Sequence, residues 1–453
     1  MTRPLTIVTV STADRLGGAE RVARRLHAGY LGLGDDAWMA VGKKRTNDAH
    51  VVEVPNQAHR SSWARTMLRA AGAVPGHGAG FQARRLLRGA IAEPGRWLSH
   101  RRGAEDFDFP GTGVIAGVAG RPSDALHLHN LHGGYFDLRA LPRLSALAPT
   151  VVTLHDAWLL SGHCAHSFAC ERWTLGCGSC PALWIYPAVA RDATAANWRR
   201  KRDIFARSVL YVATPCEWLA ERVRRSMLMP AVAELKVIPY SVDLATFRPG
   251  SRDEARRALG LDPARPVVVF LADAFAPRGW KDADALTSAL ARLGADPATG
   301  AWQLRAIGKD QQPFRAGALT VSFVPRIDDD ALMATWFRAA DLYVHPARAD
   351  TFPNAVLEAQ ACGAPVVATA VGGIPEQVDV TAGAATGALV PGGDGAALAA
   401  AIRLVMDLPA EERLAMGERA ARFIAARFGA TREVEAYRSW IHGLVARRAY
   451  AKS

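Results

Sequence analysis

The segment Asp341–Gln377 constrains the fold most, because it reads as two parallel strands joined by one helix. Leu342–His345 and Pro365–Thr369 are short apolar runs that are typical of buried strands. Pro353–Ala361 between them is predicted as a helix, since proline fits the first helical turn and Gly363 can supply a left-handed cap. Such a unit places both following loops at the carboxyl edge of a sheet, where α/β proteins bind ligands.

Alternation of apolar runs and amphipathic segments continues through most of the chain and predicts parallel sheets covered by helices. A chain of 453 residues is long enough for two domains with separate cores. Leu5–Val10 is the first predicted strand and Ala19–Leu31 the first predicted helix. The other predicted strands are Ala125–His129, Thr150–His155, Leu210–Thr214, Val267–Leu271, Trp302–Gly308 and Thr320–Val324.

Two acidic residues of the segment Asp341–Gln377 are separated by seven other residues. Asp350 falls in the loop before the predicted helix, and Glu358 falls on the helix, roughly 7 Å from its start at 1.5 Å per residue. That separation spans a sugar diphosphate, whose phosphates would meet unpaired backbone N–H groups at the helix start. An alanine-rich helix with one glutamate is also common in doubly wound folds, so the pair alone leaves a structural role open.

The whole string DTFPNAVLEAQACGAP, from Asp350 to Pro365, is more specific and resembles the E-x7-E motif of family 4 glycosyltransferases, with aspartate as the first acid. The resemblance implies the α/β GT-B fold, in which two Rossmann-like doubly wound domains face a cleft and the last helix crosses back to the N-terminal domain. It implies that Glu358 holds the donor ribose and that Asp350 approaches the transferred sugar. The other donor-binding residues expected here are Phe352, Pro353, Asn354, Gly372 and Gly373.

The expected domains follow from this resemblance. Residues 1–248 form an N-terminal, acceptor-side domain, with a basic insertion at about 55–105 and a cysteine-rich loop at 163–181. Residues 249–430 form the donor domain, after a connection, LKVIPYSVDLATFRP, that resembles the one in the family. Residues 431–453 contain the crossing helix.

Two cations follow the first predicted strand of the donor domain. Arg278 and Lys281 lie in the loop after Val267–Leu271, and either could neutralise the leaving nucleoside diphosphate. A cation in a surface loop is most often only solvated, but its place after this strand favours function. No Asp-x-Asp motif sits at a strand end, so no catalytic metal and no required cofactor are expected.

Two features of the N-terminal half suggest an acceptor side. The turn at Gly17 and Gly18 lets the backbone approach a ligand at a helix start, and GGAERV resembles the acceptor-side glycine loop of family 4. His155 ends a predicted strand; such a histidine is often structural, but the family has one that faces the transferred sugar. The segments HLHNLHGGY and EDFDFPGT resemble the colanic acid glycosyltransferase-like branch, and whether their histidines bind acceptor or stabilise loops stays open.

Four of the six cysteines cluster after His155 and suggest a structural zinc site. The alternatives are buried unpaired thiols or a redox-labile pair, because the spacing fits no standard zinc finger. The four candidate ligands are Cys164, Cys170, Cys177 and Cys180.

The net charge of +12 implies an anionic partner. Arginines gather with tryptophan and aliphatic residues in the basic insertion, which resembles either a membrane-surface helix or a solvated basic helical pair. No nucleic-acid motif is present. No apolar run approaches the 18 or so residues that span a bilayer, so we expect a cytoplasmic protein, with peripheral binding at the inner face of the membrane left open.

Taken together, the sequence predicts a retaining glycosyltransferase that moves a hexose-type sugar from a nucleotide sugar to a saccharide or lipid-linked acceptor. The branch resemblance implies a role in exopolysaccharide or capsule biosynthesis. Two rivals are a sugar-nucleotide epimerase of the same fold and a non-catalytic sugar- or membrane-binding relative.

Overall fold

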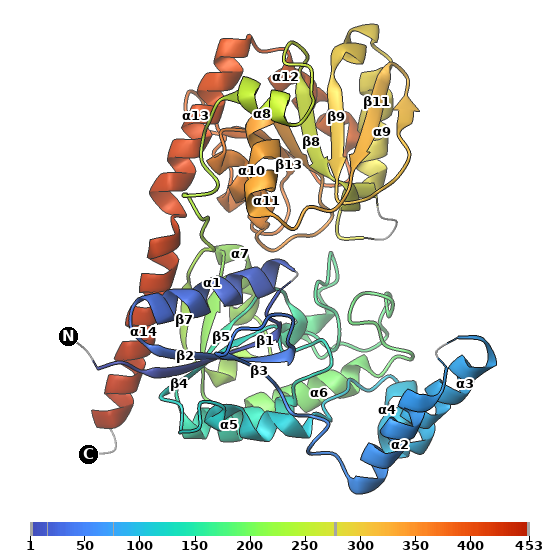
Figure 1. Cartoon of the computed structure of the whole chain (residues 1–453), viewed down its shortest axis with the longest axis vertical. Coiled ribbons are helices and arrows are strands. Elements are labelled where there is room, and N and C mark those ends of the chain that lie inside the picture. The colour runs from blue at the N-terminus through green and yellow to red at the C-terminus, as the bar shows by residue number, and fades with distance from the viewer. Residues whose placement is uncertain (1–2, 16, 76, 276–278, 451–453) are drawn as a thin grey trace. The chain divides into compact units, whose positions relative to one another are not determined.

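The computed structural model describes residues 3–15, 17–75, 77–275 and 279–450. It contains two compact units (Figure 1). Unit 1 comprises Met1–Ile238 and Val434–Ser453, and unit 2 comprises Pro239–Glu433. Each unit is built on one seven-stranded sheet.

The sheet of unit 1 has the order β3-β2-β1-β4-β5-β6-β7, and all neighbouring strands are parallel. The chain winds one way from β1 and then the other way from β4, so helices cover both faces. Figure 1 shows α1 and α5 on opposite faces. The elements are β1 (Thr6–Ala13), α1 (Gly18–Gly32), β2 (Asp36–Lys43), β3 (Val51–Glu53), β4 (Ala125–His129), α5 (Leu141–Leu147), β5 (Thr150–Thr153), α6 (Thr194–Phe205), β6 (Leu210–Thr214), α7 (Glu217–Arg224) and β7 (Val232–Val237).

The sheet of unit 2 has the order β10-β11-β9-β8-β12-β13-β14, parallel except for the β10–β11 hairpin. Helices α10 and α11 pack together on one face, and α9 and α12 pack together on the other (Figure 1). The elements are α8 (Arg252–Ala258), β8 (Val267–Leu271), α9 (Ala283–Gly294), β9 (Gln303–Ile307), β10 (Phe314–Ala316), β11 (Leu319–Val324), α10 (Asp330–Ala339), β12 (Leu342–His345), α11 (Asn354–Ala361), β13 (Val366–Thr369), β14 (Gly387–Val390), α12 (Gly395–Met406) and α13 (Ala410–Arg427).

The boundary between the units lies between Ile238 and Pro239, ten residues before the predicted end of the first domain at Arg248 (248 − 238). The segment after Pro239 packs inside unit 2. The ring of Tyr240 lies 5.6 Å from that of Phe352, and the Val242 amide donates to the carbonyl of Phe428. These contacts join residues far apart in sequence, so the composition of the connection did not reveal them.

The last helix, α14 (Ala430–Tyr450), returns to unit 1 from Val434 onward, as expected. The Arg438 guanidinium lies 2.7 Å from the Asp35 carboxylate, and His442 Nε2 lies 3.1 Å from it. The Asp35 side chain is fully buried. These charge-assisted contacts fix the helix to the end of α1.

The basic insertion folds into a helical module, which we define as residues 62–101. It consists of α2 (Ser62–Ala73), α3 (Gly78–Leu86), a π-helical turn at Leu87–Ile91 and α4 (Pro94–Arg101). Its helices pack mainly on one another and stand beside the sheet of unit 1 (Figure 1). In the part of the chain that the structure describes, no helix is long and apolar enough to cross a membrane.

Replacing His27 with leucine should make the free energy of unfolding of unit 1 less sensitive to acid. His27 is 2% exposed on α1, and among the described residues neither ring nitrogen has a hydrogen-bond partner. Burial lowers the pKa of His27 to about 4. The contribution of the His27 ring to folding stability is therefore fully present above its unfolded pKa of about 6.5, and it is lost as the pH falls toward 4.

In urea unfolding, His27→Leu should match or exceed the wild type at pH 7 and exceed it by about 3 kcal/mol at pH 4. The same change at the exposed His59 is the matched control. Parallel pH profiles for wild type and His27→Leu would contradict the expectation.

Candidate functional site

The polar residues of unit 2 meet where its sheet changes direction. Strands β8 and β12 are neighbours, and the connections that follow them lead to opposite sides of the sheet. Lys281 follows β8 and forms an isolated antiparallel bridge with Ala347 after β12. The Arg348 amide donates to the Trp280 carbonyl at 2.9 Å. These backbone bonds hold the two loops together at the edge where α/β sheets bind ligands.

Three side chains form a charged cluster at this edge. The Lys281 ammonium lies 2.6 Å from Asp350 Oδ2 and 2.8 Å from His345 Nε2. The Tyr343 hydroxyl lies 2.9 Å from Nδ1 of His345. An ammonium group only donates, so the neutral imidazole accepts at Nε2 and carries its proton on Nδ1, toward the tyrosine. The cluster therefore fixes where the Lys281 charge points.

Asp350 and His345 each have one dominant protonation state near neutral pH. Burial alone would raise the pKa of Asp350, but the Lys281 ammonium holds it well below its usual value. Burial and the nearby Lys281 charge lower the pKa of His345 to about 4. Asp350 is thus an ionised carboxylate and His345 a neutral ring. An ammonium at this edge can stabilise phosphate charge, and the carboxylate can accept hydrogen bonds from sugar hydroxyls.

Helix α11 carries Glu358, which is 7% exposed. The helix begins at Asn354, and Pro353 is its N-cap rather than its first residue. Both acids lie near the buried Tyr343 hydroxyl. Burial is the main cause that raises the pKa of Tyr343, and the charges of Asp350 and Glu358 raise it further. The structure thus brings the predicted acid pair and Lys281 to one end of the sheet.

The predicted glycine turn after β13 lies against the loop that holds Asp350. Gly372 has φ +58°, and a Cβ there would lie 1.7 Å from the Asp350 carbonyl oxygen. The Gly373 amide donates to the Thr351 carbonyl at 3.0 Å. Only glycine permits this close approach, so the turn positions the loop that carries the acid.

Phe352 and Arg278 are two residues predicted for the donor side whose side chains the structure does not place at the charged cluster. The Phe352 side chain is 3% exposed and packs on Tyr240 and Phe428, with ring centroids 5.6 and 6.0 Å apart. Its side chain therefore belongs to the core rather than to a ligand surface. Arg278 lies outside the described residues, so the structure places only Lys281 of the two predicted cations.

The predicted acceptor side of unit 1 gathers histidines at the ends of β4 and β5. His155 lies just past β5, which ends at Thr153, and its Nε2 is 2.9 Å from Nδ1 of His129. Burial and the neighbouring His129 lower the pKa of His155 well below its usual value. His155 is a neutral imidazole held by a second one, which suits hydrogen bonding to a hydroxyl group.

A second pair lies beside His155 and was not predicted. His132 Nε2 is 2.7 Å from Asp156 Oδ2, and the Tyr186 hydroxyl is 3.3 Å from His132 Nδ1. The sequence segment HLHNLHGGY indicated polar groups after β4, but their partners come from loops 24 and 54 residues away. His127 is structural, since its buried ring contacts Tyr30 and Thr153 at 2.9 and 2.8 Å.

The glycine loop after β1 adopts the expected special backbone. Gly17 has φ +118° and is the N-cap of α1, which begins at Gly18. A Cβ at Gly17 would lie 2.1 Å from a Glu20 carboxylate oxygen, and that carboxylate also accepts a hydrogen bond from Thr12. The helix start and this acid therefore face the loop end of β1.

The cysteine cluster gives no geometric support to zinc. The described residues contain no group of three or more His, Cys, Asp or Glu side chains placed to hold a metal. Cys180 Sγ lies 3.5 Å from His163 Nε2, and the Gly162 amide donates to the Cys177 sulfur. Burial raises the pKa of Cys164 to about 11 and of Cys177 to about 12, so both thiols are neutral near pH 7. The zinc site stays a prediction that metal analysis of the purified protein tests.

Comparison with known sequences gives a family match within unit 2. Residues 265–407 match the family described as glycosyl transferases group 1. A D-inositol 3-phosphate glycosyltransferase of Catenulispora acidiphila is 39% identical over 221 residues, which cover 45% of this chain and 51% of that protein. The chain thus spans about half the length of the curated relatives it matches, or less. These names differ from the colanic acid branch that the sequence segments suggested.

Solved structures match the chain over nearly its whole length. Sucrose-phosphate synthase of Thermosynechococcus elongatus has a TM-score of 0.61 at 19% identity and covers 99% of this chain and 100% of its own. Alr3699/HepE of Anabaena, solved in complex with UDP, has a TM-score of 0.60 at 16% identity, with coverage of 97% and 100%. The two parallel-sheet units therefore have the GT-B fold, and residues 265–407 match the group 1 glycosyltransferase family.

Proposed function

We propose that the protein transfers a sugar from a nucleotide-sugar donor held by unit 2 to a hydroxyl group of an acceptor held by unit 1. The observation that carries this proposal is the cluster of Lys281, Asp350 and His345 at the β8–β12 edge, with Glu358 on the helix that follows. The neighbour HepE, solved with UDP, supports a nucleotide donor.

In this proposal Lys281 stabilises the diphosphate as the bond to the sugar breaks, because negative charge grows on the leaving group. Asp350 accepts hydrogen bonds from the sugar, and Glu358 holds the ribose hydroxyls. A fixed ammonium supplies the charge that a divalent ion supplies in other transferases, so no metal is required. The Tyr343–His345 pair holds the Lys281 ammonium in place and keeps a neutral imidazole beside it.

The acceptor proposal rests on the polar groups of unit 1. His155, Asp156 and His132 offer one carboxylate and two imidazole rings for hydroxyl recognition. The relatives named D-inositol 3-phosphate glycosyltransferase make that cyclitol phosphate the first acceptor to test. The lipid-linked saccharide expected from the sequence, with a role in exopolysaccharide or capsule assembly, is the second. Retention of configuration is part of the proposal through the family 4 resemblance.

Thermal unfolding with a panel of UDP-, GDP-, dTDP- and ADP-sugars tests donor binding. One nucleotide should stabilise the wild type by about 2.7 kcal/mol at 100 times its dissociation constant. Glu358→Ala should lose that shift, and the exposed control Glu411→Ala should keep it. No shift in the wild type with any of these donors would contradict the proposal.

A product assay with the stabilising donor separates the rival functions. Transfer to an added acceptor supports the proposal, and NMR of the new linkage reports whether configuration is retained. Conversion of the donor to an epimer without acceptor would indicate the epimerase. Donor binding without any turnover over the acceptor panel would indicate a sugar-binding relative.

A further inference from the structure

The helical module carries positive charge that the rest of the chain does not balance. Residues 54–92 contain no aspartate or glutamate. Within the described part of the chain, five arginines of this stretch form no ion pair with an acid, and four of them are exposed, with Arg84 half-buried. These five are Arg65, Arg69, Arg84, Arg85 and Arg88.

Large apolar side chains are exposed between these arginines. Trp63 is 58% exposed, Phe81 50% and Leu86 52%, although α2 and α3, the helices that carry them, pack on each other. Ile91 and Leu98 are each 42% exposed. A soluble helical hairpin of this size would cover such residues, so the module presents an apolar surface together with its charge.

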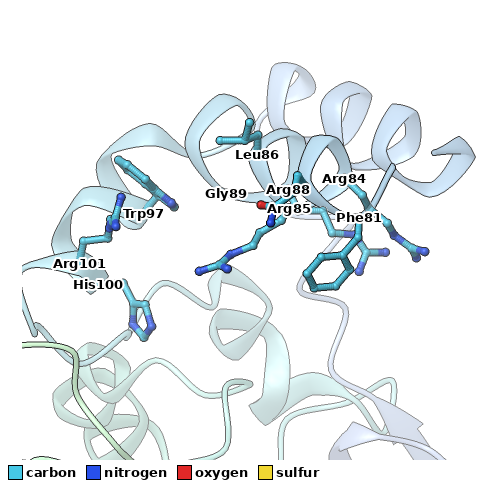
Figure 2. Close-up of a pocket in the computed structure, with 10 residues that line it drawn as sticks. Phe81, Arg84, Arg85, Leu86, Arg88, Gly89, Trp97, His100 and Arg101 are labelled. Carbon is cyan, nitrogen blue, oxygen red and sulfur yellow. The ribbon is translucent and has the colours of Figure 1, made fainter. Parts of the chain in front are cut away.

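The two kinds of side chain share one groove of 790 Å³ (Figure 2). Figure 2 shows Trp97, His100 and Arg101 on α4 on one side, and Phe81, Arg84 and Arg85 on α3 on the other. The Arg101 guanidinium lies 4.9 Å from the centre of the Trp97 ring. A second groove of 630 Å³ is lined by Arg65, Leu68, Arg69 and Arg88.

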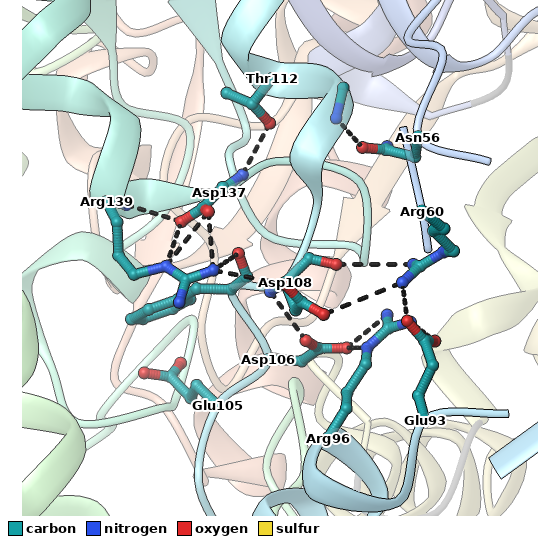
Figure 3. A network of polar contacts seen from close by, with 12 residues as sticks. Asn56, Arg60, Glu93, Arg96, Glu105, Asp106, Asp108, Thr112, Asp137 and Arg139 are labelled. Carbon is teal, nitrogen blue, oxygen red and sulfur yellow. Dashed lines mark hydrogen bonds and ion pairs between the residues drawn. The ribbon is translucent and has the colours of Figure 1, made fainter. Parts of the chain in front are cut away.

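A partly buried polar network holds the base of the module on unit 1 (Figure 3). The Arg60 side chain is 4% exposed and pairs with Glu93, which also lies 2.7 Å from Arg96. The Arg96 guanidinium reaches Asp106 at 2.6 Å. Charge-assisted pairs that share partners in this way restrain the segment, so they hold the grooves in one orientation on unit 1.

We propose that the helical module docks on an anionic phospholipid bilayer, with its arginines on the lipid phosphates and its apolar side chains at the boundary of the acyl chains. Interfacial helices bind in this way, through basic residues beside exposed tryptophan, phenylalanine and leucine. Leu86, Ile91 and Leu98 distinguish this surface from a nucleic-acid site, where aromatic stacking on bases is useful and exposed aliphatic residues are not. The docking is independent of the sugar-transfer reaction.

Vesicle sedimentation with the full chain tests the charge requirement. The wild type should bind phosphatidylglycerol-containing vesicles and not pure phosphatidylcholine. Each arginine near such a surface contributes about fivefold, so R84Q/R85Q/R88Q should bind about 100-fold more weakly. The matched control R257Q/R292Q/R315Q removes three exposed arginines of unit 2 and should bind like the wild type. Equal weakening by both triple variants, or no binding of the wild type, would overturn the proposal.

A second variant tests the apolar contribution. Leu86→Ser with Leu98→Ser should weaken vesicle binding by about tenfold or more, because both side chains leave water on docking. Both residues are exposed, so thermal unfolding should be unchanged and loss of binding will not reflect misfolding. Unchanged vesicle binding would contradict insertion of apolar groups. Tighter binding to a DNA or RNA oligomer than to anionic vesicles, at equal ionic strength, would overturn the choice of a membrane.

Discussion

Replacing Lys281 with alanine should lower kcat for sugar transfer by about 100- to 1000-fold. The ammonium lies 2.6 Å from Asp350 and 2.8 Å from His345, so its position is fixed before the donor binds. A fixed charge acts mainly on the negative charge that develops in the transition state, and its loss therefore appears in kcat. Steady-state transfer with the donor found by thermal shift measures the effect.

Removal of Glu358 should change KM rather than kcat. A residue that holds the ribose binds ground state and transition state alike, so Glu358→Ala should chiefly raise the KM of the donor. Lys236→Ala, which removes an exposed ammonium from unit 1, should leave both constants unchanged. Activity of Lys281→Ala within about threefold of the wild type would show that this ammonium does not carry the leaving-group charge.

Much of the fold around this cluster is predictable because its signals are local. The strand Leu342–His345 has the predicted bounds, and the helix ends before Gly363, which has φ +85°. Proline and glycine mark these ends within a few residues of the apolar runs they punctuate. Strands β2, β3, β7, β10 and β14 were not predicted. The three residues of β3 and of β10 offer no periodicity, and all five strands are completed by pairing partners elsewhere in the sequence.

The residues of the candidate site also divide into those with a local sequence signal and those defined by contacts between distant segments. The spacing of Asp350 and Glu358 is a local signal, and the sequence predicted both. The place of His345 in the cluster was not predicted, because a histidine at the end of an apolar strand resembles a core residue. The contact between its ring and Lys281, across 64 residues, forms only because β8 and β12 pair. The partners of His132 and His155 were hidden for the same reason.

Replacing Lys201 with methionine should destabilise unit 1 by about 3–5 kcal/mol. The Lys201 side chain on α6 is fully buried, and its ammonium lies 3.0 Å from the Glu105 carboxylate. It also donates to the carbonyls of Trp158 and Ser161 at 2.9 and 3.0 Å. Methionine fills a similar volume but leaves the Glu105 charge buried without its cation. Urea unfolding of wild type and variant measures the loss.

The loss should depend on pH and on the partner. Burial raises the pKa of Glu105, and removal of the nearby ammonium raises it further. A carboxyl group whose folded pKa is raised favours folding when it is protonated, and that stability is lost as the pH rises through the folded pKa. Lys201→Met should therefore cost less at pH 5 than at pH 8. The double variant K201M/E105Q, which has no charge to bury, should recover most of the stability at pH 8. An equal loss at both pH values, or no recovery in the double variant, would mean that packing around Trp158 matters more than the charge pair.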